Sequence, residues 1–91
     1  MGTIRDRTVV ITGAARGIGF ATAEALLRRG ARVVIGDRDI ALGESAVARL
    51  TNLGPVSGYP LDVADPQSFA TFLDKARGDG GGHIDVLINN A

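Results

Sequence analysis

Four short runs of apolar, often β-branched residues recur along the chain, each separated from the next by a longer stretch. Runs of this kind are typical of strands, and their nearly continuous apolar character predicts strands covered on both faces of a parallel sheet. The predicted strands are Thr8–Ile11, Arg32–Gly36, Val56–Leu61 and Val86–Ile88.

The stretches between the strands predict helices, because their apolar residues return every three or four positions. The first helix is expected over Gly17–Arg29, where Gly30 ends it and the arginines of the last turn suit the helix dipole. One side of this helix carries Ile18, Ala21, Ala25 and Leu26.

Two further helices follow the same spacing. The second is expected from about Asp39 to Leu53, with Gly54-Pro55 as its stop. The third begins after Asp65, which can cap it, with Pro66 in the first helical position, and it ends in the glycine-rich segment 78–82. The apolar positions of the two helices are Leu42, Ala46, Val47 and Leu50, and Phe69, Phe72, Leu73 and Ala76.

The order of these elements is β-α-β-α-β-α-β, which is typical of an α/β protein with a parallel sheet. Right-handed crossovers would place the first two helices on one face and the third on the other, with strand order 3-2-1-4. The sequence therefore predicts part of a Rossmann-type, doubly wound sheet. A complete sheet of this kind would continue past the fourth strand, so residues 1–91 are expected to be the N-terminal part of a single domain, with the fourth strand as an apolar edge.

Composition and charge exclude or disfavour several classes of partner and binding site. Ten basic and ten acidic residues give a net charge of zero, so nothing favours nucleic acid or an anionic membrane as a partner. The absence of cysteine excludes disulfides and thiolate metal sites, and no metal site is expected. The polar N-terminus lacks the apolar stretch of a signal peptide, and no run is long enough to span a membrane. We expect a soluble, cytoplasmic protein.

The candidate chemistry lies where the first strand meets the first helix, in the segment Thr12–Gly19. Glycines there allow a pyrophosphate to approach free N–H groups at the helix N-terminus, and Gly19 is expected to serve packing between helix and strand. The second strand is followed by Asp37, 18 positions after Gly19, where a carboxylate can accept the hydroxyls of an adenosine ribose. Together these features predict a dinucleotide site.

The glycine spacing Gly-x-x-x-Gly-x-Gly, formed by Gly13, Gly17 and Gly19 after Thr12, resembles that of the short-chain dehydrogenase/reductase family. The resemblance extends over the whole chain, through Asp37, Asp62-Val63 and Asn89-Asn90-Ala91.

The resemblance implies roles for the matching positions. Asp62 and Val63 would line an adenine pocket, and Asn89, Asn90 and Ala91 would stabilise the sheet beside the cofactor ribose. Thr12 would tie the glycine turn to that segment by a hydrogen bond. The cofactor-binding set expected in this way is Gly13, Arg16, Gly17, Ile18, Gly19, Asp37, Arg38, Asp62, Val63, Asn89 and Ala91.

Two kinds of side chain point to different cofactors. Asp37 favours NAD, because a 2′-phosphate would lie against its carboxylate. Arg16 and Arg38 favour NADP, since an arginine beside the ribose can bind that phosphate. We predict NAD, with NADP as the alternative.

Catalytic residues are not expected in this chain. The family's Tyr-x-x-x-Lys pair is absent, because Val63 follows Tyr59 by four positions and Thr71 precedes Lys75 by four. His83, in the glycine-rich loop, is expected to be solvated. The 91 residues alone are therefore expected to be inactive.

The leading hypothesis is a nicotinamide-dependent oxidoreductase, oligomeric when complete, that moves a hydride between the cofactor and a small alcohol or carbonyl. A non-catalytic dinucleotide sensor or an inactive subunit of the same fold is the alternative. An extended-branch epimerase or dehydratase fits the glycine spacing less well, and a methyltransferase that binds S-adenosylmethionine also remains open.

Overall fold

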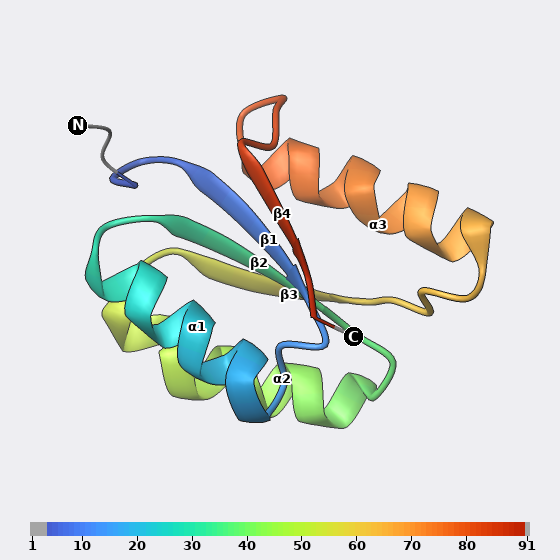
Figure 1. Ribbon diagram of the computed structural model, residues 1–91, viewed down its shortest axis with the longest axis horizontal. Coiled ribbons are helices and arrows are strands. Elements are labelled where there is room, and N and C mark those ends of the chain that lie inside the picture. Colours follow the sequence, from blue (N-terminus) through green and yellow to red (C-terminus); the bar gives the residue numbers. More distant parts are fainter. Residues whose placement is uncertain (1–3, 91) are drawn as a thin grey trace.

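A four-stranded parallel sheet forms the centre of the protein, and our computed structural model describes it within residues 4–90 (Figure 1). The strands stand in the order β3-β2-β1-β4, which confirms the predicted topology. Their bounds are Thr8–Thr12 for β1, Arg32–Asp37 for β2, Val56–Pro60 for β3 and Val86–Asn89 for β4.

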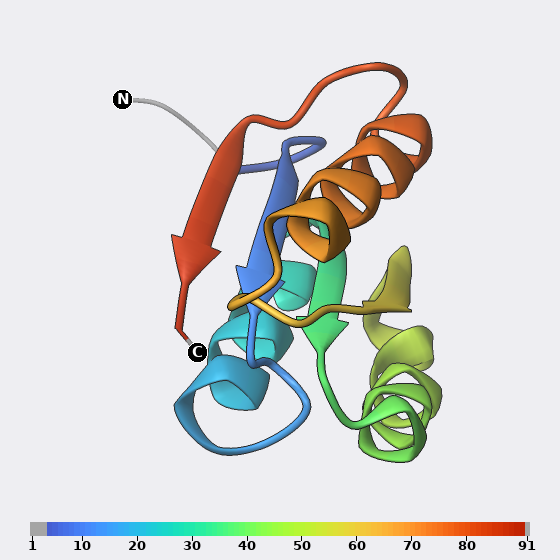
Figure 2. The ribbon, with the colours of Figure 1, turned by 90° about the vertical axis from the view of Figure 1, so that its right-hand side faces the viewer.

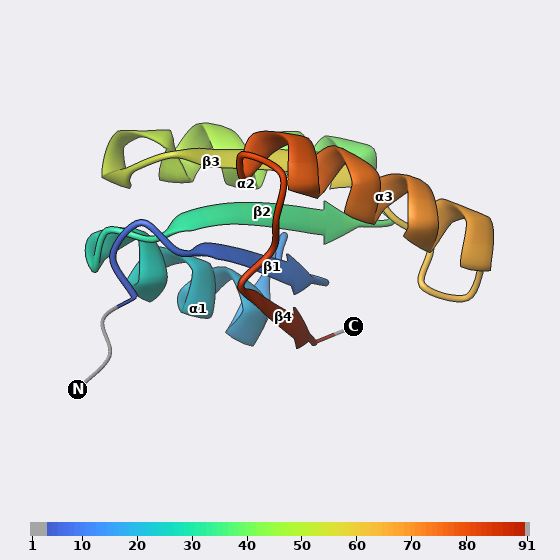
Figure 3. The same cartoon turned by 90° about the horizontal axis from the view of Figure 1, so that it is seen from above.

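Helices cover the two faces of the sheet as right-handed crossovers require. Helices α1 (Gly17–Arg28) and α2 (Ile40–Leu50) lie on one face, and α3 (Pro66–Asp79) lies on the other (Figure 1). Seen from above in Figure 3, α3 lies in front of the sheet, and α1 and α2 lie behind it. The short 3₁₀ helix η1 (Thr51–Leu53) follows α2, so the second predicted helix is α-helical only to Leu50. The α/β class and the Rossmann-type arrangement are therefore confirmed.

Two apolar clusters fill the space between sheet and helices, because alternate residues of a strand point to opposite faces. Val9 and Ile11 of β1 point toward α1 and α2, whereas Val10 points toward Phe72 of α3. All five residues of β1 are buried, and so are the four central residues of β2. The sheet's centre thus resembles the interior of a larger protein.

The outer strands are not covered on both faces as their apolar runs suggest, and β4 forms the apolar edge that was expected. β4 has no fully buried residue, and Val86 and Leu87 are 38% and 46% exposed. β3 is also only partly buried. Both strands lie at the edges of the sheet (Figure 2). The apolar run of β4, which suggested a buried strand, is therefore partly exposed.

The predicted apolar side of α1 is not its buried side. The helix buries Gly19, Ala23 and Leu27 against the sheet, while Ile18 is 78% exposed. Glycine and alanine add little to a hydrophobic pattern, yet their small size lets a helix approach a sheet closely. The pattern of large apolar residues therefore does not indicate the buried side of α1.

The third helix begins as predicted. The Asp65 carboxylate accepts the Gln67 N–H at 3.0 Å, and Pro66 occupies the first helical position. Phe72 and Ala76 are buried, with Phe69 and Leu73 packed beside them. Within residues 4–90, every helix is too short or too polar to cross a lipid bilayer.

The amino end of β4 is joined to β1 by polar groups. Asp85 accepts the Thr8 N–H through Oδ2 at 2.8 Å, and its own N–H donates to the Thr8 carbonyl at 3.0 Å. The Thr8 N–H lowers the pKa of the Asp85 carboxyl, and Arg7, 3.3 Å away, adds to this effect. The ionised carboxylate therefore stabilises the join.

Candidate functional site

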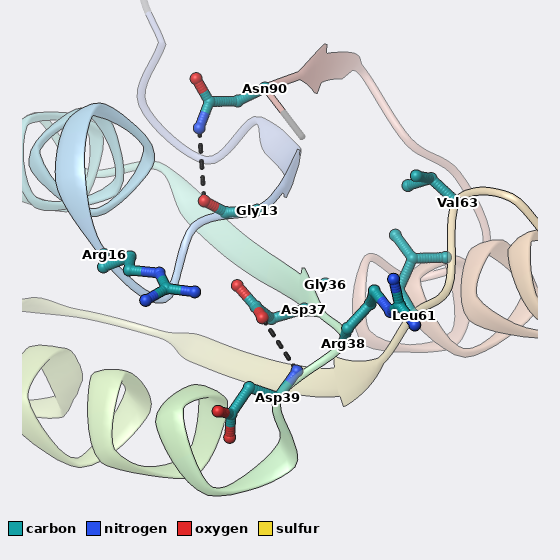
Figure 4. Close-up of a pocket in the computed structure, with 9 residues that line it drawn as sticks. All are labelled: Gly13, Arg16, Gly36, Asp37, Arg38, Asp39, Leu61, Val63 and Asn90. Carbon is teal, nitrogen blue, oxygen red and sulfur yellow. Dashed lines mark hydrogen bonds between the residues drawn. The ribbon is translucent and has the colours of Figure 1, made fainter.

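A crevice opens where the strands β1 and β2 end, on the carboxyl side of the sheet. It has a volume of about 260 Å³, and Figure 4 shows the side chains around it. Ligands of open α/β sheets bind in the crevice outside the carboxyl ends of the strands. The lining residues are Gly13, Arg16, Gly36, Asp37, Arg38, Asp39, Leu61, Val63 and Asn90.

The glycine turn between β1 and α1 forms one wall of this crevice. Gly13 and Gly17 adopt φ angles of +67° and +62°, a conformation that favours glycine. A Cβ at Gly17 would meet no atom within 4 Å, so the backbone there faces open space. At Gly19 a Cβ would lie 2.7 Å from both the Gly13 carbonyl oxygen and the Asn90 Nδ2, so this glycine permits close packing of α1 on the turn and on Asn90, whereas packing on a strand was expected.

The three helices that begin on this side of the sheet differ at their N-termini. Asp39 caps α2 by accepting the Leu42 N–H at 3.0 Å, and Asp65 caps α3. α1 has no side-chain cap, because its capping position is held by Arg16. Uncapped N–H groups and the positive end of the helix dipole attract anions. Of these three helices, α1 is therefore the one that begins without a side-chain cap, and it directly follows the glycine turn.

Asp37 lies at the end of β2, half-buried and facing the turn. Its Oδ2 accepts the Ala15 N–H at 3.3 Å, and its Oδ1 accepts the Asp39 N–H at 3.0 Å. Two exposed arginines flank it. Figure 4 shows the Arg16 side chain on the glycine-turn side of Asp37 and that of Arg38 reaching toward the Leu61 side. The crevice thus combines one carboxylate with two guanidinium groups.

The end of β4 is fastened to the glycine turn. The Thr12 Oγ1 donates to the Asn89 Oδ1 at 2.9 Å and accepts the Asn90 N–H at 3.0 Å, so the predicted hydrogen bond from Thr12 is present. The Asn90 Nδ2 also donates to the Gly13 carbonyl at 3.3 Å. Ala91, the last residue expected at the site, lies outside the described residues.

The segment after β3 supplies the opposite wall. Leu61 is buried, and Val63 is 42% exposed toward the crevice that both residues line. Asp62 is not among the lining residues. Its N–H donates to the Ser68 Oγ, and its Oδ1 accepts the Ala64 N–H, so its contacts in the structure stabilise the local turn.

The structure brings together part of the predicted cofactor-binding set. Gly17, Ile18, Gly19, Asp62 and Asn89 do not line the crevice, although they flank it in sequence. The set omits four residues that line the crevice, Gly36, Asp39, Leu61 and Asn90, although the resemblance already implied that Asn90 lies beside the cofactor ribose. Alternation along an extended segment could have found Leu61, because it shares a side with Val63. The predicted residues that line the crevice are Gly13, Arg16, Asp37, Arg38 and Val63.

The structure brings the tyrosine and the lysine of the chain close together, away from the crevice. The Lys75 Nζ lies 5.6 Å from the centroid of the Tyr59 ring, and the Tyr59 hydroxyl donates to the Asp79 carboxylate at 2.6 Å. This hydrogen bond raises the pKa of Tyr59, with burial adding to it. A phenol held protonated in this way is unsuited to act as a base near neutral pH.

Other candidate chemistry is sparse. His83 is 66% exposed at its side chain, with Nε2 3.5 Å from the Asp85 Oδ2. Among residues 4–90, no group of three or more histidine, aspartate or glutamate side chains is placed to hold a metal ion.

Comparison with known proteins gives the crevice its context. An uncharacterized oxidoreductase of Bacillus subtilis, YxbG, is 46% identical over 100% of this chain and 33% of its own length. An NAD⁺-bound xylitol dehydrogenase superposes with a TM-score of 0.92 at 28% identity, over 99% of this chain and 35% of its own. The Pseudomonas aeruginosa RhlG/NADP complex superposes with a TM-score of 0.86 at 35% identity, over 98% of this chain and 36% of its own.

The chain spans about a third of the length of these relatives. A family model described as short chain dehydrogenase matches residues 7–91. With the Rossmann-type sheet and the glycine turn at its carboxyl edge, this match shows that the chain belongs to the short-chain dehydrogenase family.

Proposed function

We propose that this chain is the adenosine-diphosphate-binding part of an NAD-dependent oxidoreductase that acts on an alcohol or carbonyl substrate. The observation that carries the proposal is the uncapped start of α1 behind an open glycine turn, with Asp37 facing it across the crevice. Family membership supports the reaction class.

The residues present fit such a cofactor. The open backbone at Gly17 and the free N–H groups of the first turn of α1 would hold the diphosphate. Asp37 would accept the ribose hydroxyls, and Leu61 and Val63 would contact the adenine. When bound, the nicotinamide supplies the hydride chemistry, whereas this chain's own residues bind and orient the adenosine end.

Asp37 also supports the choice of NAD over NADP. A 2′-phosphate carries negative charge and offers no hydrogen-bond donor to a carboxylate, whereas a ribose hydroxyl donates to it. Arg16 and Arg38 reduce this discrimination by placing positive charge on either side. One solved relative is named for NAD⁺ and another for NADP, so the choice rests on this chain's own residues.

Titration of the protein with NAD and with NADP, followed by NMR or calorimetry, tests the proposal. We expect tighter binding of NAD, loss of that preference in Asp37→Ala, and its retention in Asp65→Asn. The latter removes a charge at the same edge of the sheet while keeping a residue that can cap α3. Tighter binding of NADP by the unmodified protein would overturn the NAD assignment, and binding of neither would overturn the proposal.

The alternative, a non-catalytic sensor, predicts the same crevice. A longer form of the protein that reduces NAD in the presence of alcohols would exclude the sensor, whereas binding without turnover would favour it. Assembly into homo-oligomers and a cytoplasmic location remain predictions from the sequence.

A further inference from the structure

One carboxylate in the crevice receives two backbone N–H groups from different segments. The Asp37 Oδ2 accepts from Ala15 in the glycine turn, and the Oδ1 accepts from Asp39 at the start of the next connection. Ala15 is 5% exposed, so its N–H has little access to water as an alternative partner. Loss of the carboxylate would leave that buried donor without an acceptor.

The other bonds of the turn are concentrated at its beginning. The Gly13 N–H donates to the Gly36 carbonyl at 2.7 Å, and the Gly13 carbonyl accepts from Asn90. Ala14 and Ala15 pack in the apolar cluster that contains Val33 and Ile35 of β2, but packing does not fix the direction of an N–H group. For residues 14–16, the bond to Asp37 is the one hydrogen bond to β2 among the described residues, so the orientation of this part of the backbone depends on that side chain.

We infer that Asp37 is a positioning residue for the glycine turn, in addition to being a ribose ligand. This inference rests on the proposed function and deepens it. Through Ala15, the carboxylate holds the turn in its binding conformation before any cofactor arrives. Asp37 thereby acts on the diphosphate end of the ligand, which it does not touch.

The electron pairs of the carboxylate allow both roles at once. Two carboxylate oxygens offer about four acceptor sites, of which two backbone N–H groups use two. The others suffice for the two hydroxyls of a ribose. Asparagine could not replace it, since its single oxygen can serve one of the two N–H groups while its NH₂ would face the other donor.

A ligand without ribose hydroxyls separates the two roles. ADP and 2′,3′-dideoxy-ADP share the adenine and the diphosphate, but the dideoxy compound offers Asp37 no hydroxyl. A role limited to the ribose predicts that Asp37→Asn binds dideoxy-ADP as well as the unmodified protein, or more tightly, because a negative charge is lost. The positioning role predicts the opposite sign, about tenfold weaker binding, as expected for one lost charge-assisted hydrogen bond.

The matched control is Asp65→Asn, which removes an equal charge at the same edge of the sheet without touching the turn. We expect it to bind dideoxy-ADP like the unmodified protein. If Asp37→Asn does not fold, Asp37→Ser gives the same comparison, because its hydroxyl is too short to bridge the two N–H groups.

Amide hydrogen exchange without ligand gives an independent readout. In Asp37→Ala, which leaves no side-chain oxygen for either N–H group, the Ala15 amide should exchange at least tenfold faster, with Val34 in β2 unchanged as an internal reference. Unchanged exchange at Ala15, or undiminished binding of dideoxy-ADP, would overturn the inference. Because exchange needs no ligand, it decides the positioning role even if ADP fails to bind, a failure that would count against the proposed function alone.

Discussion

Strand β1 has two neighbours that are attached in different ways. β2 pairs with it through buried residues, and Val33, Val34 and Ile35 are completely inaccessible to solvent. β4 pairs with it in the same parallel register, but its apolar residues are partly exposed. Side-chain hydrogen bonds at each end of β4 also attach it to β1. These polar joins link Asp85 to Thr8 at one end and the asparagines 89 and 90 to Thr12 at the other.

This difference separates two sources of stability. Burial of apolar side chains stabilises β2 and is not directional. The hydrogen bonds at the ends of β4 are directional, so they determine the positions of the atoms that they join. The join at Thr12 lies beside the crevice, so it determines where the backbone after β4 runs past the glycine turn. The exposed middle of β4 contributes less to stability, although the sequence there is as apolar as in β2.

The strongest test of this comparison uses two isoleucines that flank Ile11 in the register, Ile35 of β2 and Ile88 of β4. Ile35 is 0% exposed, and its replacement by alanine should cost about 2–5 kcal/mol of unfolding free energy. Ile88→Ala should cost clearly less, because that side chain is only partly buried. Urea unfolding measures both, and equal losses would contradict the comparison.

A second test removes a polar join without changing volume. Thr12→Val eliminates the hydroxyl that donates to Asn89 and accepts from Asn90. Since Thr12 is buried, we expect a loss of about 1–3 kcal/mol, with hydrogen exchange accelerated at Ile88 but not at Val34. Equal acceleration in both strands would mean that the join is not specific to β4.

The smallest effect is expected at the other join and depends on pH. The pKa of Asp85 is lowered in the folded protein, so its stabilisation is present above the ordinary value of 3.8 and is lost as pH falls through the lowered value. Asp85→Asn should therefore be less stable than the unmodified protein near neutral pH, and the gap should close in acid. Urea unfolding at several pH values measures it, and a constant gap would contradict the assigned cause.

The elements and their order were predictable because each depends on local signals. Short, mostly apolar runs located all four strands, and Asp65-Pro66 located the start of α3. Right-handed crossovers then determined the strand order. Local signals failed where a neighbour decides the outcome, as in α1, whose small residues Gly19 and Ala23 are buried while Ile18 is exposed.

The candidate site was predictable to a similar degree. Glycine spacing and the position of Asp37 located the crevice from the sequence, because those residues are required by backbone geometry and charge. The bond from Ala15 to the Asp37 carboxylate was not predictable, since it depends on the distance between segments 22 positions apart, whereas the bond from Asp39 is local. The proximity of Tyr59 to Lys75 was hidden for the same reason.

The uncapped N-terminus of α1 implies a compromise between the stability of the fold and the binding of a ligand. Serine, threonine, aspartate or asparagine at position 16 would stabilise the helix by roughly 0.5–2 kcal/mol relative to a residue that cannot cap it. Selection for thermal robustness alone would favour such a residue, yet its oxygen would occupy N–H groups that no side chain now caps. Attempts to make this protein more heat-resistant should therefore leave that position unaltered and seek their gains on the far side of the molecule.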